Sequence, residues 1–178
     1  MLSIVRDGCA ARLSLAVTGR RRRRHHRDDS LPDPPANPCD GAGMTTFVID
    51  APVAISLATT GASIPSEHSL AAPTLLRSQV LALVYESVRG GEIDEREGRK
   101  VLDRIRGLRI RLLGDRSLQD HAWRIAAELN WPDTYRAEFI ALTQLQADAL
   151  ATADHEFASA ASAFVPTVPP AQILASSS

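Results

Sequence analysis

Two aspartates each close a short apolar run, and about a hundred residues separate them. Asp50 follows Thr46-Phe-Val-Ile, and Asp154 follows Ala149-Leu-Ala-Thr-Ala. Apolar runs that end in an acid are typical of buried parallel strands, which carry their last residues to the carboxyl edge of a sheet. Open α/β folds bind ligands at that edge, and paired carboxylates favour a hard divalent cation such as Mg²⁺. The two acids therefore predict a metal site.

Other kinds of chemistry find little support. The sequence contains no internal repeat, glycine-rich phosphate loop or paired-cysteine metal motif. Ser56, Ser78 and Thr152 have no histidine–acid arrangement that would make any of them a nucleophile. His155 directly follows Asp154, and it either contacts phosphate, acts as a base, or lies at the surface in the first turn of a helix, which is the favoured interpretation.

The composition of the chain changes near Met44. Residues 1–43 contain both cysteines and eight arginines, five of them consecutive, and their charge balance is +3. The remaining 135 residues carry 12 basic and 16 acidic side chains, a balance of −4. We expect 1–43 to be a disordered or non-native leader, 44–174 to form one domain and 175–178 to be a tail. The arginine run could instead bind nucleic acid or anionic lipid.

Cysteine content and hydropathy bound the location. The expected domain has no cysteine, so disulfides play no part and a cytoplasmic location is the default. No apolar stretch is long enough to predict a transmembrane segment.

Helical and strand patterns alternate along the expected domain. Strands are expected over 45–50, 108–113, 149–153 and 164–168, with a loop over 59–72. Helices are expected over 52–58, from Pro73 to the stop at Gly90, from a cap at Asp94 to about 106, from a cap at Asp115 to about 129, from Pro132 to about 142, and over 155–162. This alternation predicts an α/β fold with a parallel sheet between helices.

Four short motifs occur in order: Val48-Ile-Asp50, Pro73-Thr-Leu-Leu-Arg-Ser-Gln-Val80, Thr134-Tyr-Arg-Ala-Glu138 and Ala151-Thr-Ala-Asp154. Together they resemble the PIN domain, specifically the VapC-like toxins of bacterial toxin–antitoxin pairs, over about 45–174. The resemblance implies a PIN-like three-layer α/β/α fold with a parallel central sheet. It also implies a ribonuclease whose acids hold Mg²⁺ or Mn²⁺ to activate water. An antitoxin protein, RNA and a second copy in a homodimer are the implied candidate partners.

Two of the four usual acidic positions of this family are altered. Asp50 and Asp154 match, so the resemblance makes them the catalytic metal ligands. Gln79 stands where the family usually has an acid, and its carbonyl oxygen could still contribute to a site. Arg136 stands at the other position. An arginine cannot ligate a cation, and its fixed charge would compensate the two aspartates.

Two nearby acids are possible substitutes for the missing carboxylates. Asp133 lies three residues before Arg136, on the same face of a helix, and is either the helix N-cap, the favoured role, or a displaced metal ligand. Glu138 lies two residues after Arg136 and points roughly 200° away, so it is a poor substitute.

These residues leave three functions open. The leading one is a VapC-like ribonuclease weakened by Gln79 and Arg136. The second is a catalytically inactive PIN domain that binds a protein or RNA, which Arg136 favours. A weaker third is a metal-independent nuclease in which Arg136 stabilises charge on the phosphorane. Arginines at 104, 106, 109 and 111 either form an RNA-binding patch or, as we favour, a solvated face.

Overall fold

The computed structural model describes residues 44–174, and the predictions for residues 1–43 and 175–178 lie outside this range. Its centre is a five-stranded sheet in which every pair of neighbouring strands is parallel. The strand order is β3-β2-β1-β4-β5. The strands are β1 (Thr45–Ile49), β2 (His68–Pro73), β3 (Ile110–Leu113), β4 (Ala149–Ala151) and β5 (Thr167–Val168).

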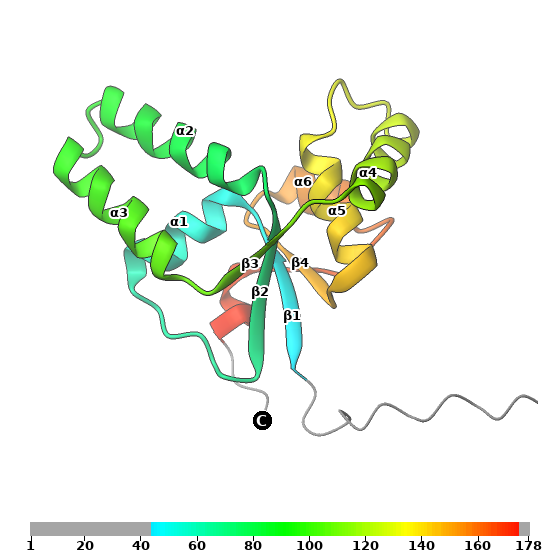
Figure 1. Ribbon diagram of the computed structural model, residues 1–178, viewed down its shortest axis with the longest axis horizontal. Coiled ribbons are helices and arrows are strands. Elements are labelled where there is room, and N and C mark those ends of the chain that lie inside the picture. Colours follow the sequence, from blue (N-terminus) through cyan, green and yellow to red (C-terminus); the bar gives the residue numbers. More distant parts are fainter. Residues whose placement is uncertain (1–43, 175–178) are drawn as a thin grey trace, which may run out of the picture. The chain divides into compact units, whose positions relative to one another are not determined.

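Helices cover both sides of the strands. Figure 1 shows α1, α2 and α3 on one side and α4, α5 and α6 on the other. The helices are α1 (Ala51–Thr60), α2 (Leu76–Arg89), α3 (Glu95–Gly107), α4 (Arg116–Glu128), α5 (Tyr135–Gln146) and α6 (His155–Ala161), followed by the 3-10 turn η1 (Pro170–Leu174). The predicted three-layer α/β/α fold with a parallel central sheet is therefore confirmed. None of the helices in the described residues is both long and apolar enough to cross a membrane.

The central strands are apolar because helices cover both faces of the sheet. Val48 and Ile49 of β1 and Leu150 of β4 are fully buried. On the helices only one face is buried, as at Leu118, Ala122 and Ile125 of α4, and this follows the predicted helical period. The core thus holds the ends of β1 and β4 rigidly, and the candidate site begins at these ends.

The local structure predicted for residues 59–75 was wrong in two respects. Residues 59–72 were expected to form a loop, but 68–73 form β2, which lies between β1 and β3. The residues of this strand, His-Ser-Leu-Ala-Ala-Pro, are mostly small or polar, so it lacks the apolar run that marks β1. The helix start expected at Pro73 was also wrong. Pro73 is the last residue of β2, where it pairs with Leu113, and α2 begins only at Leu76.

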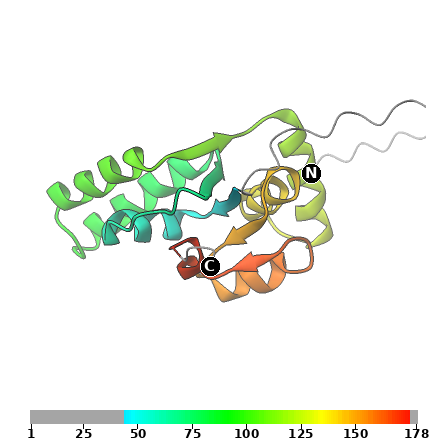
Figure 2. The same cartoon turned by 90° about the horizontal axis from the view of Figure 1, so that it is seen from below.

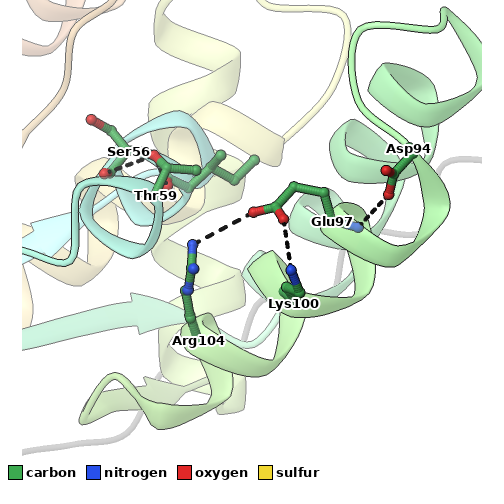
Figure 3. A network of polar contacts seen from close by, with 7 residues as sticks. Ser56, Thr59, Asp94, Glu97, Lys100 and Arg104 are labelled. Carbon is green, nitrogen blue, oxygen red and sulfur yellow. Dashed lines mark hydrogen bonds and ion pairs between the residues drawn. The ribbon is translucent and has the colours of Figure 1, made fainter.

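Helix α3 begins where its cap was predicted. The carboxylate of Asp94 accepts a hydrogen bond of 2.7 Å from the backbone N–H of Glu97. The Glu97 carboxylate in turn pairs with Lys100 at 3.3 Å and with Arg104 at 3.7 Å, one turn and two turns further along (Figure 3). These ion pairs are solvated and contribute little stability, so the cap is the main local determinant of this end.

Gly98 lets α3 approach α2 closely. A Cβ atom at this position would lie 2.8 Å from a methyl group of Val88 and 3.4 Å from one of Val84. Only a residue without a side chain fits this crossing. Figure 2 shows the resulting pair, α2 and α3, extending away from the strands.

Candidate functional site

The pairing of β1 with β4 builds the first part of the site. Ile49 is paired with Ala151, so the next residues of the two strands, Asp50 and Thr152, lie side by side. The Thr152 hydroxyl donates a hydrogen bond of 2.5 Å to Asp50 Oδ2. Asp50 Oδ1 accepts a second bond of 3.0 Å from the N–H of Val53, which caps α1. Both oxygens of this buried carboxylate therefore already have donors.

Asp154 is held in a similar way at the start of α6. Its Oδ1 accepts a hydrogen bond of 2.9 Å from the N–H of Phe157 and so caps the helix. Its own N–H donates to the Thr152 hydroxyl oxygen at 3.1 Å. One threonine therefore connects the two aspartates, donating to one and accepting from the backbone of the other.

Arg136, from the first turn of α5, completes the cluster. Its Nη2 donates to Asp154 Oδ2 at 2.7 Å. The guanidinium also lies 5.4 Å from the centre of the Phe157 ring, within the range of a cation–π contact. The side chains of Arg136 and Asp154 are 47% and 38% exposed, so solvent partly screens their ion pair.

All four family positions meet in one cavity of about 270 Å³. Asp50, Gln79, Arg136 and Asp154 line it together, as the resemblance predicted. The rest of the lining is apolar and comes from α1, α2, α5 and α6, namely Ala51, Pro52, Ala82, Leu83, Phe139 and Phe157. The cavity thus combines four polar side chains with mainly apolar walls at the carboxyl ends of β1 and β4.

Burial dominates the electrostatics of Asp50. Desolvation raises its pKa above the ordinary value, and the nearby charge of Asp154 raises it further. The hydrogen bonds from Thr152 and Val53 and the charge of Arg136 act in the opposite direction and do not cancel the effect of burial. A second ionised carboxylate in this pocket is therefore costly, and the cation of Arg136 offsets part of that cost.

The residues present do not fit a Mg²⁺ or Mn²⁺ ion. Every oxygen of Asp50 and Asp154 already accepts a hydrogen bond, and the donor to Asp154 Oδ2 is the fixed cation of Arg136. Over residues 44–174 no three histidine, cysteine or acidic side chains come together as a metal site would require. The guanidinium thus supplies the positive charge that a metal ion would otherwise bring.

The other acids proposed from the sequence lie outside this cavity. Asp133 is exposed and accepts a hydrogen bond of 3.0 Å from the N–H of Tyr135. The N-cap of α5 is Thr134, so the prediction that Asp133 is the N-cap was wrong. Asp133 lies one residue before the N-cap and still accepts a hydrogen bond from the start of the helix. A metal-binding role for Asp133 stays a prediction. Glu138 is half-buried, which raises its pKa, and like exposed His155 it is absent from the cavity lining.

Two residues of the site were not identified from the sequence. Thr152 was considered only as a nucleophile, whereas it organises both aspartates. Its adjacency to Asp50 follows from the register of two strands that are about a hundred residues apart, which no local pattern reveals. Phe157 occurs at a helical spacing of three from Asp154, and this is the only signal that could have placed it beside the site.

Comparisons with known proteins connect this domain to solved structures alone. No family model matches the chain, and no curated protein matches it. PAE2754 from Pyrobaculum aerophilum matches with a TM-score of 0.58 at 19% identity, over 75% of this chain and 96% of its own. VapBC2 from Rickettsia felis, bound to a DNA fragment from their promoter, matches with a TM-score of 0.52 at 10% identity, over 70% and 98%. At these identities the likeness establishes the fold, and the described domain has the PIN-like, VapC-like architecture that its motifs predicted.

Proposed function

We propose that this domain is a catalytically inactive PIN domain that acts by binding a partner protein of the antitoxin kind. The observation that carries the proposal is the ion pair of 2.7 Å between Arg136 and Asp154 inside the cavity of the two aspartates. A cation built into the chain balances the remaining carboxylates without a metal ion. An arginine cannot be deprotonated in a protein, so this occupation persists at every physiological pH.

Binding rather than catalysis is then the retained role of the fold. The structural match to VapBC2 supports a protein partner, because that neighbour belongs to a two-component assembly. Nothing in such a role requires the carboxylates to be free. Their hydrogen bonds cap α1 and α6, so they also serve the stability of the domain.

Metal titration of the full chain tests the inactive site. In calorimetry with MnCl₂ and MgCl₂ we expect no saturable binding to the wild type and new Mn²⁺ binding to Arg136→Asp. Arg124→Asp, at an exposed position of α4, is the matched control with the same change in charge, and it should gain no Mn²⁺ binding. Saturable binding by the wild type that disappears in Asp50→Asn, together with cleavage of a structured RNA, would refute the proposal.

Co-expression tests the partner. The full chain, tagged and produced together with the product of the adjoining reading frame, should elute from size exclusion as a complex of fixed stoichiometry. Asp50→Asn should form the same complex, because binding does not depend on the charge of that carboxylate. Separate elution of the two proteins would contradict the proposed role.

The competing function is a weakened metal-dependent ribonuclease. One observation favours it: Asp50, Asp154 and the amide of Gln79 line a single cavity, where their oxygens could converge if Arg136 swung out. The side chain of Arg136 is 47% exposed, so it can swing into solvent. The calorimetric titration separates the two functions, since only the competing one predicts metal binding by the wild type.

A further inference from the structure

An apolar groove lies between α2, α3 and β3. Its first cavity, of about 520 Å³, is lined mainly by aliphatic side chains, including Val80 and Leu81 of α2, Leu102 and Ile105 of α3, and Ile110 and Leu112 of β3. Ile110 and Leu112 are two residues apart, so the same face of β3 points into it. None of these residues contributes to the carboxylate cavity.

The groove continues along α2. A second cavity, of about 470 Å³, shares Leu81 and Leu102 with the first and adds Val84, Tyr85 and Val88. Leu81 is 57% exposed and Tyr85 is 62% exposed. Helix α2 has 14 residues and is therefore about 21 Å long. Exposed apolar side chains that border two adjoining cavities can form an interaction site.

Arginines flank the groove. Arg77 lines the first cavity and Arg89 the second, and neither forms an ion pair with another residue between 44 and 174. They lie twelve residues apart on α2, about 18 Å along the helix axis. Residues 76–113 as a whole carry nine basic and six acidic side chains, a balance of +3. The other charged residues of the lining are already paired, Arg99 with Glu95 and Arg106 with Asp103. The groove thus offers apolar contacts between two separated arginines, Arg77 and Arg89, and its one acid is neutralised by an ion pair.

We propose that this groove, which we call the α2–α3 groove, binds an amphipathic segment of the partner protein whose apolar side chains are flanked by carboxylates. The inference rests on the proposed function and names the surface and the chemistry by which the partner is recognised. Apolar side chains would fill the two cavities, and the carboxylates would meet Arg77 and Arg89. Burial supplies the affinity, and the charges supply the choice of partner.

Three other occupants fit the groove less well. The leader, residues 1–43, has a charge balance of +3, the same sign as the flanking arginines. A second copy placed by a two-fold axis would bring the +3 balance of residues 76–113 against the same positive balance. RNA would satisfy the arginines, but it has no aliphatic groups for Leu81, Leu102 and Ile105 to contact.

Two synthetic peptides of about 14 residues test the groove directly. Both carry leucines at helical spacing, one with glutamates and the other with lysines at the remaining positions. In ¹⁵N-NMR titrations of the full chain, the glutamate peptide should shift the signals of α2, α3 and β3, and the lysine peptide should bind at least tenfold more weakly. Equal binding of both peptides, or shifts that map elsewhere, would overturn the proposal.

Variants separate contact with the groove from general effects on the protein. Leu81→Glu, and Arg77→Glu combined with Arg89→Glu, should each weaken the glutamate peptide at least tenfold. Trp123→Glu is the matched control, since Trp123 is 71% exposed on α4 and lies outside both cavities. Unchanged affinity in the groove variants, or an equal loss in the control, would refute the assignment.

The remaining occupants give their own outcomes. If a single-stranded RNA shifts the groove signals and the glutamate peptide does not, the groove is an RNA site and the proposal fails. If sedimentation shows a dimer that Leu81→Glu dissociates, the groove belongs to a second copy and the proposal likewise fails. Metal binding and RNA cleavage by the wild type, with the groove still selecting the glutamate peptide, would instead refute the proposed function alone.

Discussion

The carboxylate cavity and the α2–α3 groove differ in whether their side chains have partners within the protein. In the cavity, every carboxylate oxygen of Asp50 and Asp154 accepts a hydrogen bond from the chain itself. In the groove, Leu81 and Tyr85 are more than half exposed, and two flanking arginines have no ion-pair partner within residues 44–174. The cavity is complete by itself, whereas the groove gains from a ligand.

Charge follows the same division. Residues 76–113, which form α2, α3 and β3, have a balance of +3, whereas residues 114–174 carry three basic and eight acidic side chains, a balance of −5. An acidic segment is therefore directed towards the groove and away from α4, α5 and α6. When a side chain of the protein neutralises the carboxylates at the edge of the sheet, a neighbouring surface can therefore become the main site for binding a partner.

The largest expected effect comes from breaking the wall of the groove. Gly98→Leu should lower the free energy of unfolding by about 3 kcal/mol, because the new side chain would enter the space of Val88 and Val84. Chemical denaturation measures the loss. Gly107→Leu is the control, since a Cβ there meets no atom within 4 Å. Similar losses in both variants would show that α2 and α3 do not depend on the close approach at Gly98.

Thr152→Val should break the link between the two aspartates. The substitution keeps the shape of the side chain but removes the donor to buried Asp50 and the acceptor for the N–H of Asp154. We expect a loss of about 2 kcal/mol in unfolding free energy, since unpaired buried polar groups are costly. Thr152→Ser, which retains the hydroxyl, should recover most of it. An unchanged melting temperature in Thr152→Val would remove this residue from the site.

Arg136→Asp sharpens the comparison by reopening the cavity. Three carboxylates would replace two carboxylates and one cation, and the contact with Phe157 would be lost. We expect about 1 kcal/mol of destabilisation without metal, because the pair is partly exposed. Mn²⁺ should restore the melting temperature by mass action. Binding of the glutamate peptide to the groove should not change, and a parallel loss there would show that the two regions are coupled.

The smallest effect concerns the titration of Asp50. Burial raises its pKa in the folded protein above the ordinary value of 3.8. Between pH 3.8 and the raised pKa, the folded state therefore binds more protons than the unfolded state. The contribution of Asp50 to stability is therefore full below pH 3.8 and is lost as pH rises through the raised pKa. Thermal melts from pH 3.5 to 7 should show Asp50→Asn gaining relative to wild type as pH increases, and a constant difference would contradict this.

The predictable features of this protein were the local ones. The caps of α3 and α4 and the apolar stripe of α4 depend on residues within one or two turns, so the sequence by itself located these helices. The same holds for β1, whose apolar run is followed directly by Asp50, and for β4, whose apolar run ends shortly before Asp154. The four ordered motifs added the PIN-like architecture and brought Asp50, Gln79, Arg136 and Asp154 to one cavity.

Only the tertiary structure decided how these pieces act. The strand β2 has no local apolar signal, and its place between β1 and β3 is set by pairing on both sides. The bond between Thr152 and Asp50 depends on register across about a hundred residues, and the ion pair of Arg136 with Asp154 depends on how α5 and α6 pack. The groove exists because Gly98 lets α3 approach α2. Such contacts join distant segments, and no periodicity within one segment encodes them.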